Sequence, residues 1–213
     1  MRLSKDLVFA NIFCLLLIVF LTGCSVRTET VQDARIISDN SEPIILNVMF
    51  RYQTSQIGCG IAALSTVLSY WDFQNELSDL EQTHSPDTQS GYSIRKLISV
   101  AQAVGLKAFV AKMDENAVKK QILLGRPVIV PIRKSAYGFD IDEFVLFQFI
   151  KNNILDRIMN IENLYYNHYV VLSGFNKGSF LILDPSDGVL WIANDRLAKM
   201  RIPFDSASLL AGR

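Results

Sequence analysis

Apolar side chains recur along the chain at spacings that predict helices and strands. After Cys59, they return every three or four positions, which is the spacing of one buried helix face. These positions are Ile61, Leu64, Val67, Leu68 and Trp71. Further helices are predicted near residues 93–104, 114–124 and 194–200, and strands at 44–50, 106–111 and 127–132.

Two apolar runs in the last third of the chain predict a β-hairpin. The first run begins at His168 and ends at Phe175, and the second, residues 179–183, ends in Asp184-Pro185. A short turn at Lys177-Gly178 separates them. In an antiparallel hairpin, the start of one strand lies near the end of the next. We therefore expect His168 and Asp184 to be neighbours.

The first 23 residues have the composition of a targeting signal. Arg2 and Lys5 precede an apolar run of about 10 residues that ends at Leu21. Such a run is too short to span a bilayer, which takes roughly 20 residues, but it suits the core of a signal peptide. Leu21-Thr22-Gly23-Cys24 resembles the lipobox of bacterial lipoproteins, which implies cleavage before Cys24 and a lipid on that cysteine. The alternatives are an ordinary signal peptide or a short anchor helix that ends in cysteine.

Three segments follow from this pattern: a lipoprotein signal peptide (1–23), a polar flexible tether (24–42) and a globular domain (43–213). The lipobox resemblance implies that lipid on Cys24 attaches the chain to a membrane of the cell envelope. In Gram-negative lipoproteins, a serine such as Ser25 after the cysteine is compatible with sorting to the outer membrane. The expected location in that case is the periplasmic face of the outer membrane.

Charge argues against nucleic acid as a partner. The chain has 21 basic and 21 acidic residues, and the basic residues form no block or stripe. Phosphate binding needs clustered lysine and arginine. No metal or other cofactor is expected either, because the histidines and cysteines do not cluster at the spacing of metal ligands.

Cysteine and histidine are scarce, which narrows the candidates for chemistry. Cys14 lies inside the predicted signal and Cys24 would carry lipid, so Cys59 is the one thiol left for the domain. Cys59 is either a small buried hydrophobe or a nucleophile at the start of a helix, where backbone N–H groups stabilise a thiolate. His84 lies in a polar turn and is expected to be a solvated loop residue. His168, taken alone, could be a core histidine.

Taken together, four motifs resemble the C39 family of papain-like cysteine peptidases, known for removing leader peptides after a double glycine. Gln53 lies six residues before Cys59, and Cys59-Gly60 opens the predicted helix. The histidine strand begins His168-Tyr-Val-Val, and Asp184-Pro185 follows His168 by 16 residues. The resemblance covers residues 43–200. It implies an α+β, papain-like fold, in which a helical half with the nucleophile helix packs on an antiparallel β-sheet.

The resemblance also implies the roles of the residues. Cys59 would be the nucleophile, His168 the base and Asp184 the group that orients the histidine. Gln53 and the backbone N–H of Cys59 would form the oxyanion hole. The implied substrate is an exported polypeptide, cut at small-residue or Gly-Gly sites. Stand-alone secreted relatives occur beside secretion and functional-amyloid export systems, which suggests a role supporting such a system.

One departure from compact members of that family is an apolar insertion near 133–166. Its apolar side chains approximate a helical stripe. They are Phe144, Phe147, Ile150, Ile154, Ile158 and Ile161. The segment is a helix packed on the domain, a lid over the cleft, or a surface, near 139–166, that docks a membrane or secretion-system partner.

Three other functions compete with the peptidase. One is a C39-like module that binds peptides and cuts them poorly or not at all, which has no need for all four site residues. Another is a different thiol hydrolase of the cell envelope, such as the NlpC/P60 type, which usually has Asp-Cys-Ser-Gly where this chain has Gly58-Cys59-Gly60. The last is a structural lipoprotein, against which the joint spacing of the motifs argues.

Overall fold

The structure is a computed structural model that describes residues 42–73, 76–135 and 165–213. The helices are α2 (Cys59–Tyr70), α3 (Leu77–Thr83), α4 (Ile94–Ala103), α5 (Glu115–Leu123), α7 (Asn194–Arg201) and the 3₁₀ turn η3 (Ile202–Phe204). The strands are β1 (Ile44–Ile45), β2 (Lys107–Lys112), β3 (Val128–Ser135), β4 (Tyr165–Phe175), β5 (Ser179–Asp184), β6 (Gly188–Ala193) and β7 (Ala207–Gly212).

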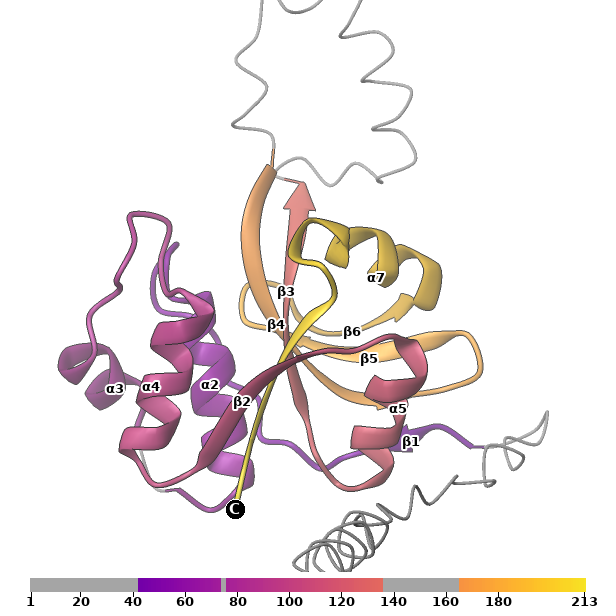
Figure 1. Ribbon diagram of the computed structural model, residues 1–213, viewed down its shortest axis with the longest axis horizontal. Helices are drawn as coiled ribbons and strands as arrows, with labels where there is room; N and C mark the ends of the chain where they lie inside the picture. Colours follow the sequence, from indigo (N-terminus) through magenta and orange to yellow (C-terminus); the bar gives the residue numbers. More distant parts are fainter. Residues whose placement is uncertain (1–41, 74–75, 136–164) are drawn as a thin grey trace, which may run out of the picture. The chain divides into compact units, whose positions relative to one another are not determined.

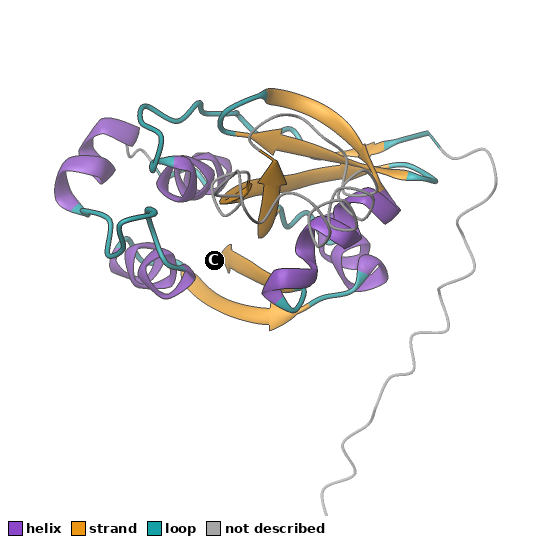
Figure 2. Ribbon diagram, turned by 90° about the horizontal axis from the view of Figure 1, so that it is seen from above, coloured by secondary structure: helices purple, strands orange, loops and turns teal. Residues whose placement is uncertain are grey.

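The strands of the described residues belong to one antiparallel sheet in the order β2-β7-β3-β4-β5-β6. Figure 1 shows how the strands run, and Figure 2 shows them in orange among the helices. The long strand β4 is central, with β3 along one edge and β5 along the other. β1 continues the β3 side of β4, because Ile44 and Ile45 pair with Phe175 and Gly174, beyond the last residue that β3 reaches.

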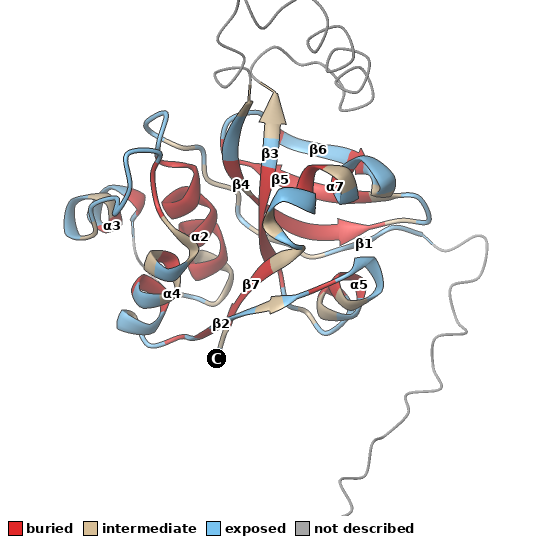
Figure 3. Ribbon diagram, turned by 45° about the horizontal axis from the view of Figure 1, so that its top comes forward, coloured by how far each residue is buried: buried red, intermediate tan, exposed pale blue. Residues whose placement is uncertain are grey.

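Helices cover both faces of the sheet. Successive residues of a strand point to opposite faces, so one strand can supply two hydrophobic clusters. Ile129 and Val171 pack in the cluster that contains α2 and α4, whereas Val130 and Val170 pack in the cluster that contains α5 and α7. Figure 3 shows the resulting pattern, with buried central strands and the outer strand β6 largely exposed.

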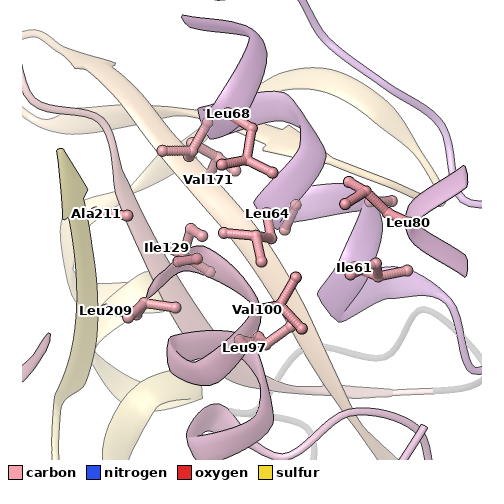
Figure 4. Packing of buried hydrophobic residues seen from close by; sticks show 14 of the residues in the cluster. Ile61, Leu64, Leu68, Leu80, Leu97, Val100, Ile129, Val171, Leu209 and Ala211 are labelled. Carbon is pink, nitrogen blue, oxygen red and sulfur yellow. The ribbon is translucent and has the colours of Figure 1, made fainter. Parts of the chain in front are cut away.

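Helix α2 is the best buried helix of the described residues. Every residue from Cys59 to Leu68 is buried. Figure 4 shows Leu64 and Leu68 pointing from this helix toward Ile129 and Val171 of the sheet. Burying a leucine side chain is worth about 2 kcal/mol, so the packing fixes the position of the helix, and of Cys59 at its first turn.

The sequence predicted most of these elements. The helices near 93–104, 114–124 and 194–200 are confirmed as α4, α5 and α7, and both strands of the hairpin are confirmed. Ser93 and Asp114 cap α4 and α5 by accepting backbone N–H groups of Lys96 and Ala117, which explains where these helices begin. The predicted α+β fold, with a helix packed on an antiparallel sheet, is confirmed.

The strand predicted at 44–50 is wrong beyond its first two residues. The N–H of Val48 bonds to the carbonyl of Leu46 at 3.0 Å, and this tight turn takes the chain away from the edge of β4. The N–H of Arg51 then bonds to the Thr66 hydroxyl of α2 at 3.2 Å. The segment therefore crosses from the sheet to the helix instead of extending the sheet.

The structure also defines where the predicted insertion is attached. β3 continues to Ser135 and β4 begins at Tyr165, so residues 136–164, with the apolar stripe, lie outside the described residues. The signal, Cys24 and most of the tether lie outside them as well. Within the described ranges, no helix has the length and hydropathy that crossing a bilayer takes.

Candidate active site

Cys59 is the first residue of α2 and carries a free, buried thiol. The preceding Gly58 provides no side-chain cap, so no side chain competes for the N–H groups of the first turn. Gly60 allows close packing here, because a Cβ atom on it would lie 3.1 Å from Tyr92 Cβ and 3.3 Å from Tyr169 Cδ2. The helix thus presents the thiol at its N-terminus, with Tyr92 and Tyr169 packed against the next residue.

His168 connects Cys59 with Asp184. The imidazole is 2% exposed, and its Nε2 atom lies 2.6 Å from Oδ1 of Asp184. Asp184 ends β5, one residue past Leu183, which pairs with Val171 of β4. The Cys59 side chain lies close enough to His168 to help raise the pKa of the imidazole. Because Nε2 is engaged by Asp184, Nδ1 is the ring nitrogen that remains for the thiol.

Several donors besides the histidine hold the Asp184 carboxylate. Oδ1 accepts the backbone N–H and the hydroxyl of Ser186, each at 2.8 Å, and Oδ2 accepts Nζ of Lys134 at 2.8 Å. The carboxylate is 2% exposed. A buried carboxylate stays ionised only when its oxygens are satisfied in this way.

The ionisation of the site follows from these contacts. Burial alone would lower the pKa of His168, but the hydrogen bonds and charges of Asp184 and Cys59 raise it from 6.5 to about 9. Burial works in the opposite direction on Asp184, yet His168, Lys134 and the Ser186 N–H hold the pKa of that carboxyl well below its usual range. Near neutral pH the pair is therefore an imidazolium beside a carboxylate.

Gln53 lies on the loop that leads to α2. Its backbone N–H donates to the carbonyl of Pro185 at 2.9 Å, so Gln53 is tied to the turn that follows Asp184. Its side-chain oxygen is buried without a hydrogen-bond partner among the described residues. The structure thus places Gln53 beside the turn of the aspartate, and its part in an oxyanion hole stays a prediction.

The loop between Gln53 and Cys59 is held by contacts with α3 and with Gly91. The Thr54 hydroxyl donates to Glu81 at 2.5 Å, and the N–H of Gly58 bonds to the carbonyl of Ser55 at 3.1 Å. Gly91 has a φ of +118°, and a Cβ atom on it would lie 2.6 Å from the carbonyl oxygen of Ile57. The nucleophile therefore follows a loop with little room to move.

His84 lies apart from this group. It follows α3 as the C-cap residue, and its carbonyl accepts the Tyr92 hydroxyl at 2.7 Å. Across the described ranges, no group of histidine, cysteine and acidic side chains has the arrangement of a metal site.

Sequence reasoning missed two residues of the site, Lys134 and Ser186. Ser186 lies in the turn after the aspartate and could have been found there, because an aspartate side chain in a turn often accepts the backbone N–H two residues on. Lys134 gave no local signal, since it is 50 residues before Asp184 and meets it only through the pairing of β3, β4 and β5.

The mixed helix and antiparallel sheet, with a cysteine at a helix N-terminus facing a histidine strand, is the fold of C39 papain-like peptidase domains. The chain belongs to the Peptidase_C39 like family, whose model matches residues 45–200. No curated protein matches the chain.

Three solved structures with the same fold are distant from this chain in sequence. A putative C39-like peptidase from Bacillus anthracis superimposes with a TM-score of 0.58 at 18% identity, covering 81% of this chain and 98% of its own. The peptidase domain of Streptococcus ComA, a bi-functional ABC transporter of a quorum-sensing pathway, gives 0.55 at 17% identity over 80% and 99%. A double glycine motif protease from an AMS/PCAT transporter, in complex with the leader peptide, gives 0.51 at 18% over 81% and 98%.

Proposed function

We propose that this chain is a cysteine endopeptidase of the C39 type, with Cys59 as nucleophile and His168 as general acid and base. One observation carries the proposal: Cys59 of α2, His168 of β4 and Asp184 of β5 come together in the fold. His168 Nε2 lies 2.6 Å from Asp184 Oδ1, and Cys59 is close enough to raise the pKa of the imidazole. A histidine oriented by a carboxylate and facing a thiol is the arrangement that activates a nucleophile. A buried structural cysteine needs neither partner.

The reaction would proceed in two steps. The Cys59 sulfur forms a bond to the carbonyl carbon of the peptide, the C–N bond breaks, and the His168 imidazolium gives its proton to the leaving amine. Water then attacks the thioester, His168 takes a proton from that water, and the acid leaves with the sulfur restored as thiolate. The Gln53 amide and the Cys59 N–H would hold the negative oxygen in both steps.

We infer a polypeptide as the substrate, because the family is one of peptidases and one structural neighbour was solved with a leader peptide. We also propose that the enzyme prefers small residues or Gly-Gly before the cleaved bond. The exported nature of the substrate is part of the proposal too, and it follows from the lipobox-like Leu21 to Cys24. Lipid on Cys24 would hold the enzyme at the cell envelope, on the periplasmic face of the outer membrane in a Gram-negative cell.

The test of activity compares the full chain, purified in detergent, with its Cys59→Ala variant on a peptide library that contains Gly-Gly sites. Mass spectrometry identifies the cleaved bonds. Cleavage by the wild type and none by the variant supports the proposal. If neither protein cuts, peptide mapping after iodoacetamide treatment at mildly acidic pH measures the reactivity of Cys59. An unreactive thiol would reject the catalytic role and favour a peptide-binding module.

The location has a separate test. Cells that express the wild type are grown with labelled palmitate, and the chain is expected to take up label and to sediment with membranes. The Cys24→Ala variant should do neither, whereas a Cys14→Ala variant should behave as the wild type. Labelling that survives the loss of Cys24 would contradict the lipoprotein proposal.

A further inference from the structure

Lys134 lies behind the histidine–aspartate pair, with every donor of its ammonium group used. Nζ contacts Oδ2 of Asp184 at 2.8 Å, Oδ2 of Asp187 at 2.7 Å and the Ser186 hydroxyl at 2.9 Å. The lysine side chain is 17% exposed and the Asp184 side chain 3%. An ammonium group has three hydrogens, so these three acceptors saturate it.

This contact differs from an ordinary surface ion pair. Exposed pairs contribute little because water screens them, and the lysine keeps many conformations. Here the carboxylate is buried, and Lys134 binds the oxygen that His168 does not use. Without that partner, one oxygen of a buried anion would be left unsatisfied, which favours either protonation of Asp184 or rotation of its carboxylate.

The same lysine stabilises the turn on which Gln53 depends. Asp184, Ser186 and Asp187 form one turn, in which the Asp187 N–H bonds to the Asp184 carbonyl at 3.2 Å. Lys134 binds a side chain of each of these three residues. The Gln53 N–H bonds to Pro185 within that turn. Lys134 on β3 therefore contacts both the Asp184 carboxylate and the turn to which the Gln53 backbone is bonded.

We infer that Lys134 is a positioning residue, which holds the Asp184 carboxylate ionised and directed at His168 by binding its second oxygen. The inference deepens the proposed function and, for its effect on catalysis, rests on it. Among the residues that the structure describes, the charged and titratable groups that face His168 and Asp184 are Cys59, Lys134, Asp187 and Tyr166.

The test replaces Lys134 and observes His168 directly. The full chain in detergent, with ¹⁵N-labelled histidine, has only two histidines, so the two sets of imidazole signals are readily assigned. The variants are Lys134→Met, Lys134→Arg and, in case the methionine variant does not fold, Lys134→Gln. Lys112→Met is the matched control, because Lys112 lies at the end of β2 and forms an exposed ion pair with Asp205.

In the wild type we expect a strongly downfield imidazole N–H signal, the signature of the hydrogen bond to Asp184. Lys134→Met and Lys134→Gln should lose this signal and lower the pKa of His168 by about one unit, since a disordered carboxylate stabilises the imidazolium less. Lys134→Arg should retain the signal at least in part, and Lys112→Met in full. Alkylation of Cys59 at pH 6 should slow about tenfold in the neutral variants.

Loss of a nearby positive charge, by itself, would raise the pKa of His168 instead. A raised or unchanged pKa with the downfield signal intact would therefore overturn the inference and leave Lys134 as a neighbouring charge. These readouts need no substrate. If they behave as expected while the wild type cuts no peptide, the proposed function fails and the role of Lys134 stands. With an active enzyme, kcat should fall about tenfold in Lys134→Met at unchanged KM.

Discussion

Replacing Asp184 by asparagine removes the charge that holds His168 protonated while keeping the size of the side chain. The wild-type pKa of about 9 is the result of burial, which lowers it, and of the contacts with Asp184 and Cys59, which raise it. The hydrogen bond to Asp184 is the largest of the contributions that raise it. With that contribution gone, burial should prevail, and the pKa of His168 is expected to fall to 6.5 or below.

The size of the effect follows from that difference. Lowering the pKa from about 9 to 6.5 corresponds to about 3 kcal/mol of lost interaction with the imidazolium, since each pKa unit is worth roughly 1.4 kcal/mol. The folded-state pKa of His168 lies above the unfolded value, so this stabilisation is fully present below pH 6.5 and is lost as the pH rises through about 9. Asp184→Asn should therefore destabilise the protein most below pH 6.5. Above pH 9 the difference should shrink to what the variant loses in its contacts with Lys134 and Ser186.

Two measurements check this reasoning. An NMR titration of the imidazole signals gives the pKa of His168 in both proteins, and the separate signals of His84, which lies outside the site, make the His168 signals easy to identify. Urea unfolding at pH 6 and pH 10 gives the difference in the free energy of unfolding. The reasoning is refuted if His168 in Asp184→Asn still titrates near pH 9, or if the loss of stability is the same at both pH values.

Three further predictions concern the rest of the site. The rate of peptide cleavage should decline as the pH rises through about 9, because the imidazolium that protonates the leaving amine is lost. A rate that still rises at pH 10 would contradict the role of His168 as general acid. Gln53→Ala should lower kcat by about 10²–10³-fold with little change in the melting temperature. Gln56→Ala, on the same loop, is the control for both measurements. Equal activity of the two variants would contradict a role of Gln53 in the oxyanion hole. Gly91→Ala should lower the free energy of unfolding in urea by about 1–3 kcal/mol and slow alkylation of Cys59, because its Cβ would collide with the Ile57 carbonyl at a φ of +118°. Gly178→Ala is the control and should leave stability unchanged, because a Cβ atom there has nothing within 4 Å. Two equally stable variants would argue against a tight loop.

The hairpin was predictable because its information is local. His168 opens an apolar run and Asp184 closes the next, with a two-residue turn between them, so pairing the runs brings the two side chains together. The spacing did not show the irregularity at Ser173, between the pairs Leu172–Ile182 and Gly174–Leu181. That irregularity sets which residues of β4 face β5, and it depends on packing across the whole sheet.

Elements that depend on distant contacts were not predicted. β7 is a short run, Ala207–Gly212, whose strand character comes from lying between β2 and β3. β6 is exposed at three successive positions, Val189 to Trp191, so it lacks the alternation that indicates a half-buried strand. Lys134 belongs to the same class, because its role exists only once β3, β4 and β5 are aligned.

The position of β7 in the sheet determines when folding of the domain can finish. β2 and β3 do not pair with each other; each is joined to β7, with Leu209 opposite both Val110 and Ile129. A growing chain that has reached α7 but not Leu209 therefore has a gap in its sheet, with the face under α2 and α4 incomplete. Since non-local strand pairing is slow to form, folding should finish late, after synthesis of residues 207–212. A chain shortened by those residues should remain a target for degradation even though every residue of the candidate active site is still present.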